Sequence, residues 1–138
     1  MWEHGAYCDI EDKFTGVTAI IQNGKFSLAI GIPKTEEMRL LKTGYSMGNA
    51  ITSANKETVE GFIFWDVGET THTTYLAHYL SGVIIFIYVE QTVTVNGVDD
   101  STSTWDNVTL QPGWNSVSYK SGTYTNVTDL SPYRWEIY

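Results

Sequence analysis

Cysteine is nearly absent from this sequence: Cys8 is the only one, so no disulfide can form within the chain. The single cysteine argues against a small secreted module of the kind that disulfides hold together, and it says nothing about the compartment. Basic residues are also few, with 8 Lys and Arg against 16 Asp and Glu and a formal net charge of −8. A surface of this sign repels phosphates, which argues against nucleic acid and anionic lipid as partners.

Long hydrophobic runs are missing as well. The longest apolar run, residues 83–89, is far shorter than the roughly 20 residues that a transmembrane helix needs. The opening Met1-Trp-Glu-His-Gly5 has no apolar stretch of the kind found in signal peptides. We therefore expect no transmembrane segment and no targeting segment in these residues, although a targeting segment that had been removed would leave no trace here.

Aromatic and hydrophobic residues are abundant, at 14% and 42% of the 138 residues. This composition excludes a disordered chain, and the length suits one domain. Residues 1–12 are mixed in character and predict a poorly ordered lead-in. Residues 13–138 predict a single β-sandwich domain, because aromatic and β-branched side chains fit the pleated surface of a sheet.

The clearest strand signals lie between residues 83 and 119. Residues 83–89 are apolar at every position, which predicts a strand covered on both faces. Val93 and Val95 alternate with threonines, which is typical of a strand with one wet face. Gln111-Pro112-Gly113 predicts a turn between two further strands, because proline suits the first central position of a type II turn and glycine the second.

Turn and capping residues predict the other elements. Asn23-Gly24 lies between two alternating runs in residues 14–32 and predicts a β-hairpin. Residues 35–44 predict one short helix, with Thr35 as its N-cap and Gly44 as its end.

Three more segments favour strands. Residues 59–67 and 133–138 alternate between core and surface side chains. Residues 70–80 fit either a strand or a helix, and their threonine content favours the strand. Together the elements predict an all-β protein: an antiparallel β-sandwich of about eight or nine strands with one short helix. A lipocalin-like barrel is the alternative.

No residue pattern indicates a metal or cofactor site. His72 and His78, with Asp66 and Glu69 nearby, are the strongest metal candidates, but six residues of strand would separate the histidines by roughly 20 Å. Asp99, Asp100 and Asp106 flank a polar loop that suits a solvated turn better than a calcium site.

Hydrolase signatures are also missing from the sequence. The strand-associated acids are expected to point to solvent rather than into a cleft, and they are Glu60, Asp66, Glu90 and Glu136. We therefore expect a protein that is not an enzyme and that carries no cofactor.

Two tryptophans are out of phase with their neighbours. Trp105 is three residues before Val108, and Trp114 is three residues before Val117. In a regular strand each tryptophan would therefore point to the face opposite that valine. If both stay exposed, with Tyr124 nearby, these three residues would form a stacking platform for a sugar ring. The competing interpretation, which we favour, is that they cap the edge of the sandwich or form a cross-strand aromatic pair.

Two stretches resemble the C-terminal half of certain uncharacterised bacterial lipoproteins. They are Ile87-Tyr-Val-Glu-Gln-Thr-Val-Thr-Val-Asn-Gly97 and Asn107-Val-Thr-Leu-Gln-Pro-Gly-Trp-Asn-Ser-Val-Ser-Tyr119, followed by a final Trp-containing strand at residues 134–138. The matching motifs consist of turn and core residues and include no catalytic element. Cys8 departs from the family pattern, because no apolar lipobox precedes it.

The resemblance implies a β-sandwich of the bacterial cell envelope or periplasm without assigned activity. From the residues and this likeness together we expect a non-enzymatic exported or cell-envelope protein that binds or scaffolds an unknown protein or glycan. One alternative is a carbohydrate-binding module that uses exposed Trp and Tyr side chains. Another is a small-ligand carrier with a barrel cavity.

Overall fold

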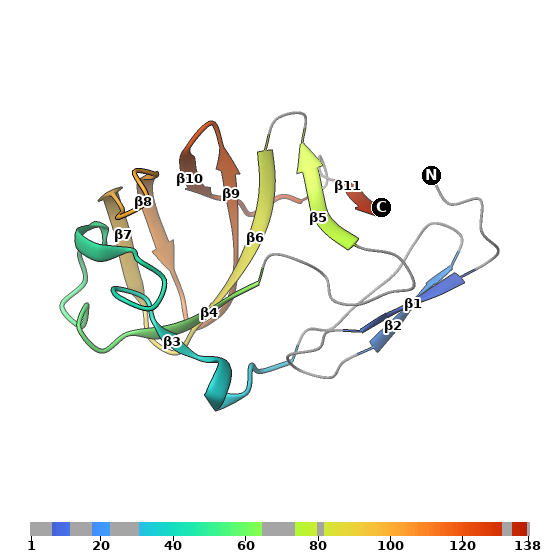
Figure 1. Ribbon diagram of the computed structural model, residues 1–138, viewed down its shortest axis with the longest axis horizontal. Coiled ribbons are helices and arrows are strands. Elements are labelled where there is room, and N and C mark those ends of the chain that lie inside the picture. Colours follow the sequence, from blue (N-terminus) through green and yellow to red (C-terminus); the bar gives the residue numbers. More distant parts are fainter. Residues whose placement is uncertain are drawn as a thin grey trace.

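A computed structural model describes residues 7–11, 18–22, 31–64, 74–79, 82–130 and 134–137. This part of the chain is all-β (Figure 1), and its helical pieces are two short 3-10 turns. The elements in chain order are β1 (Tyr7–Glu11), β2 (Thr18–Gln22), η1 (Thr35–Glu37), β3 (Arg39–Leu40), η2 (Gly48–Ala50), β4 (Glu60–Phe64), β5 (Thr74–Tyr79), β6 (Gly82–Val89), β7 (Val93–Val98), β8 (Thr104–Leu110), β9 (Gly113–Lys120), β10 (Thr123–Asn126) and β11 (Arg134–Ile137).

Nine of the described strands belong to one curled sheet. Its main path is β11-β5-β6-β9-β10-β8-β7, and β4 joins it along β6 and carries β3 on its other side. In Figure 1 this path runs from β7 at the left to β11 at the right. Among the described strands, each pair is antiparallel except one: β10 runs parallel to β8. The expected purely antiparallel arrangement is therefore interrupted at that pair.

The first two strands form a separate two-stranded sheet. Residues Tyr7–Glu11 of β1 pair with Thr18–Gln22 of β2, and β1 lies within residues 1–12, the predicted lead-in. The turn predicted at Asn23-Gly24 lies outside the described residues.

Most strand predictions within the described residues are confirmed. The apolar run 83–89 is β6, and Ile84 and Ile85, which point to opposite faces, are 2% and 1% exposed. Residues 74–79 form a strand, as the threonine content favoured. Strands β4 and β11 occupy the described parts of 59–67 and 133–138, and residues 65–73 are not described.

The turn predicted at Gln111–Pro112–Gly113 separates β8 from β9, and Gly113 has a φ of +101°. Asn115 holds this turn: its Oδ1 accepts the Gln111 backbone N–H at 2.9 Å, and its Nδ2 donates to the Gln111 carbonyl at 2.9 Å. A glycine fits the positive φ without the steric cost of a side chain.

The predicted helix at residues 35–44 is wrong. Only Thr35–Glu37 is helical, Met38 is extended (φ −73°, ψ 139°), and Arg39–Leu40 pairs with β4. The extended path brings Leu41 into the core, where its exposed fraction is 0%. Sheet pairing and the burial of Leu41 outweigh a local helix preference, which in so short a segment is weak.

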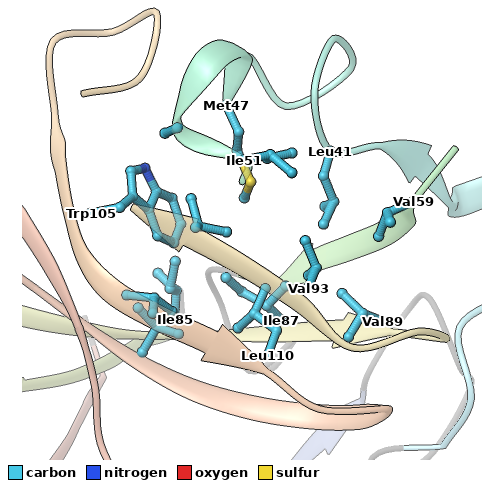
Figure 2. Packing of buried hydrophobic residues seen from close by; sticks show 14 residues of the cluster. Leu41, Met47, Ile51, Val59, Ile85, Ile87, Val89, Val93, Trp105 and Leu110 are labelled. Atoms are coloured by element: carbon cyan, nitrogen blue, oxygen red, sulfur yellow. The ribbon is translucent and has the colours of Figure 1, made fainter. Parts of the chain in front are cut away.

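The core lies between the sheet and an irregular segment, residues 41–59, which we call the covering segment. Figure 2 shows Leu41, Met47 and Ile51 of this segment facing Ile87 and other strand residues. The buried cluster comprises Leu41, Met47, Ala50, Ile51, Val59, Ile85, Ile87, Val89, Val93, Val95, Trp105, Val108, Leu110 and Val117. We call the sheet side that meets the covering segment the inner face and the opposite side the outer face.

The covering segment is tied to the sheet at its start and near its middle. Its start follows β3, which pairs with β4. Near its middle, Ile51 forms a bridge with Val95 of β7, where the Thr52 N–H donates to the Thr94 carbonyl at 2.9 Å. The segment therefore spans the curl of the sheet from the β4 side to the β7 edge.

Leu41→Ala should lower the free energy of unfolding by about 2–5 kcal/mol, because it empties a fully buried site between the covering segment and the sheet. The matched control is Leu130→Ala, since Leu130 is 38% exposed, and its effect should stay within about 0.5 kcal/mol. Urea denaturation followed by circular dichroism measures both. Equal losses in the two variants would contradict the described core.

Candidate binding surface

Trp105 is buried, with an exposed fraction of 3%, and belongs to the core cluster on the inner face. The condition for an exposed stacking platform therefore does not hold at this position. Its ring packs against Tyr124, with ring centroids 4.0 Å apart and an interplanar angle of 16°. This is the cross-strand aromatic pair of the competing interpretation, formed between β8 and β10.

A β-bulge explains why the alternation pattern misplaced Trp105. In the β7–β8 pairing, Val95 lies opposite Val108 and Gly97 lies opposite Trp105, with a register shift between them. Two residues of β8 thus face one residue of β7, and the extra residue returns Trp105 to the face of Val108. Asn107, in the bulge, has a φ of +48° and donates its backbone N–H to the side chain of its partner in β7 at 3.1 Å.

The loop between β7 and β8 is organised by Asp99. Its Oδ1 accepts the backbone N–H groups of Ser101 at 2.8 Å and Ser103 at 3.0 Å. Its Oδ2 accepts the Nε1–H of Trp105 at 2.9 Å. This carboxylate therefore satisfies the only hydrogen-bond donor of a buried indole and shapes the turn before it.

Tyr124 has an aromatic neighbour on each side. Since β10 lies between β8 and β9, its ring stacks on Trp105 on one side and meets Tyr119 on the other, at 4.5 Å between centroids and 38°. A sugar ring needs a free aromatic face for stacking, and these contacts occupy both sides of Tyr124. Burial, and then the nearby Tyr119 and Asp99, raise the pKa of Tyr124 to about 12.

Trp114 lies on the outer face, as its phase relative to Val117 predicted. Its ring meets Tyr88 at 5.4 Å and Phe62 at 6.1 Å between centroids, both edge-on. Its Nε1–H donates to the Gly31 carbonyl at 3.0 Å. The structure therefore brings Trp105 and Tyr124 together and sets Trp114 on the other side of the sheet, so these three rings do not share one surface.

The outer face of β7, β8, β10 and β9 carries aligned hydroxyl side chains. Direct cross-strand neighbours are Thr94 with Thr109 and Thr104 with Thr123, while Thr125 lies beside the buried Ser118. Each threonine follows or precedes a residue that points to the inner face, so the pleat turns the threonines outward. We call this surface the hydroxyl face, and its residues are Thr94, Thr104, Thr109, Ser116, Thr123 and Thr125.

The members of the hydroxyl face reach solvent. Thr104 is exposed, and the other five are half-buried, as expected for side chains flanked by neighbouring strands. Sequence reasoning identified the wet face of β7 but did not connect it with β8, β9 and β10. The signal was the alternation of Thr or Ser with buried residues, and strand order was needed to join the pieces.

The acidic residues that we considered for catalysis or metal binding do not converge in the described regions. Glu60 and Glu90 are exposed. Among the residues that the structure describes, no group of three or more His, Cys, Asp or Glu side chains could hold a metal ion. His78 lies in β5, whereas Asp66, Glu69 and His72 are outside the described residues.

The described part of the chain contains no helix that is long and apolar enough to cross a membrane. Comparisons with known proteins do not assign a family, since no family model, no curated protein and no solved structure matches this chain.

Asp99→Ala should lower the free energy of unfolding by more than about 2 kcal/mol, because hydrogen bonds to a charged group contribute about 1.5–3 kcal/mol each and the buried indole N–H would lose its partner. Asp100→Ala, which removes the neighbouring exposed carboxylate, should cost less than about 0.5 kcal/mol. Urea unfolding of both variants gives the comparison. If Asp100→Ala cost as much as Asp99→Ala, the assigned hydrogen bonds would not be the cause.

Stability should fall as the pH rises above 10, the ordinary tyrosine pKa, toward 12, the value for Tyr124 in the folded state. In this window the folded state keeps a proton that the unfolded chain releases, so the unfolding free energy decreases with pH. Tyr124→Phe should remove this part of the slope, as measured by urea unfolding at several pH values. An unchanged slope in Tyr124→Phe would show that Tyr124 titrates normally.

Proposed function

We propose that this protein is a non-enzymatic binding or scaffolding protein and that the hydroxyl face is its contact surface. The observation that carries the proposal is the alignment of uncharged hydroxyl side chains on four neighbouring strands. Such a surface offers many hydrogen-bond donors and acceptors on a rigid scaffold. By contrast, the polar side chains with the most elaborate contacts, Asp99 and Asn115, bond to the protein itself.

We further propose that the protein is exported and acts in the bacterial cell envelope or periplasm. The support is the likeness of residues 87–97 and 107–119 to envelope lipoproteins. In the structure these residues lie along β6 to β9, which include much of the hydroxyl face. Export of this kind is consistent with a partner such as an envelope glycan or protein.

For the finer description of the fold, we propose a half-open barrel rather than a sandwich. One hydrogen-bonded path connects β3 through β4, β6, β9, β10 and β8 to β7, whereas a sandwich needs two facing layers. The covering segment fills the inner face with Leu41, Met47 and Ile51 (Figure 2). Because a carrier needs that space for its ligand, we prefer a surface-binding role to the carrier alternative.

The test combines a binding and an activity measurement. ¹⁵N-labelled protein would be titrated with solubilised bacterial envelope glycans and envelope proteins, while chromogenic esters, glycosides and phosphate esters are assayed for turnover. We expect amide shifts centred on β8 and β10 and no turnover above that of heat-denatured protein. Turnover of a substrate, or a spectrum that no envelope component changes, would contradict the proposed function.

A further inference from the structure

We propose that the hydroxyl face binds a neutral polysaccharide, whose sugar hydroxyls bond to the threonine rows. This inference rests on the proposed function and names the class of ligand. The rows run across the sheet: Thr104 lies beside Thr123, Thr94 lies beside Thr109, and Thr125 follows two residues after Thr123 on the same side of β10.

The spacing of the hydroxyls follows from sheet geometry. Neighbouring strands lie about 4.7–4.9 Å apart, and alternate residues along a strand are about 7 Å apart. A hydroxyl group both donates and accepts hydrogen bonds, and so does each hydroxyl of a sugar. Thr104 is exposed and Thr109, Thr123 and Thr125 are half-buried, so their side chains reach solvent. They are therefore available to a ligand.

Charge favours a neutral ligand. The six side chains of the hydroxyl face are uncharged, and the chain as a whole carries a formal charge of −8, which disfavours an acidic polysaccharide. Lys120 is the cross-strand neighbour of Thr123 and lies at the border of the face. A protein partner would be expected to use several apolar anchors. Beside these six positions lies one exposed apolar side chain among the described residues of β7, Val98, which is 58% exposed and pairs with Thr104.

The scaffold holds the threonines in place before a ligand arrives. Threonine is branched at Cβ, so its side chain has little rotational freedom to lose. Asn126 ties β10 to β8: its Oδ1 accepts the Thr109 N–H at 2.9 Å, and its Nδ2 donates to the Thr109 carbonyl at 3.1 Å. A surface that is ordered in advance loses less entropy on binding.

The inner aromatic stack takes no part in this binding. Trp105 is buried, and Tyr124 has rings on both sides. Binding would therefore depend on hydrogen bonds without ring stacking, which predicts low affinity for a short oligosaccharide. A long polymer with repeated hydroxyl groups should bind better, because it can engage several copies of the protein.

Affinity electrophoresis in native gels tests this inference with the complete chain. Dextran, laminarin and glucomannan serve as neutral probes, and alginate serves as the acidic control. The variant Thr123→Val/Thr125→Val removes two hydroxyls while keeping the size and strand preference of the side chains. The controls are Thr123→Ser/Thr125→Ser, which keeps the hydroxyls, and Thr43→Val, which changes an exposed threonine in the turn that follows β3.

We expect at least one neutral polysaccharide to retard the wild-type protein and alginate to leave it unchanged. The valine variant should bind at least tenfold more weakly, whereas the serine and Thr43→Val variants should bind like the wild type. Melting curves of all variants would show that the valine variant is folded.

Retardation that persists in a folded valine variant, or retardation by alginate, would overturn the inference and leave a binding function in place. Wild-type protein that no neutral probe retards would also overturn it, while the envelope titration would still decide the proposed function. Hydrolysis of a probe would instead contradict the proposed function itself.

Discussion

Packing of the covering segment, residues 41–59, against the inner face is the contact on which the rest of the structure depends. A curled sheet without a second layer would expose its apolar side chains to water, and each large one that is buried contributes about 1.5–3 kcal/mol. Leu41, Met47 and Ile51 supply the missing layer, and no α-helix among the described residues shares this task. Because the segment is irregular, it depends on its two attachments, β3 on β4 and Ile51 on Val95, to stay in register with the sheet.

The same packing explains why the bulge in β8 is needed. Trp105, at the start of β8, is the large side chain that fills the inner face there. Strict alternation with Val108 would have turned it outward. The extra residue at Asn107 corrects the phase, and burial then creates a need for a hydrogen-bond partner at the indole nitrogen. Asp99 meets that need from the loop that the bulge follows. The burial of Trp105 thus accounts for both the bulge at Asn107 and the hydrogen bonds of Asp99 in the preceding loop.

The sequence supports those parts of the fold in which local pattern and tertiary environment agree. The apolar run of β6, the alternation of Val93 and Val95, and the turn before Gly113 are examples, because each follows from side-chain direction or from an allowed φ. The helix expected at residues 35–44 fails because local capping signals say nothing about where Leu41 must go. The face expected for Trp105 from strict alternation is wrong because the bulge leaves only one sign in the sequence, an Asn that tolerates positive φ. The candidate surface was inaccessible to sequence reasoning because it exists only once β10 is inserted between β8 and β9.

The two faces of the sheet differ in what they leave for a partner. On the inner face, Asp99 accepts the indole N–H of Trp105, and Tyr124 stacks on Trp105. These side chains therefore stabilise the fold and are not free to bind a partner. On the outer face of β8 and β10, the threonines gain strand stability from their branched Cβ and still present a hydroxyl to solvent. Threonine, which favours strands, thereby also creates a regular polar surface at little cost to the stability of the fold. For this reason we look for function in the repeated spacing of the outer face and not in a cleft.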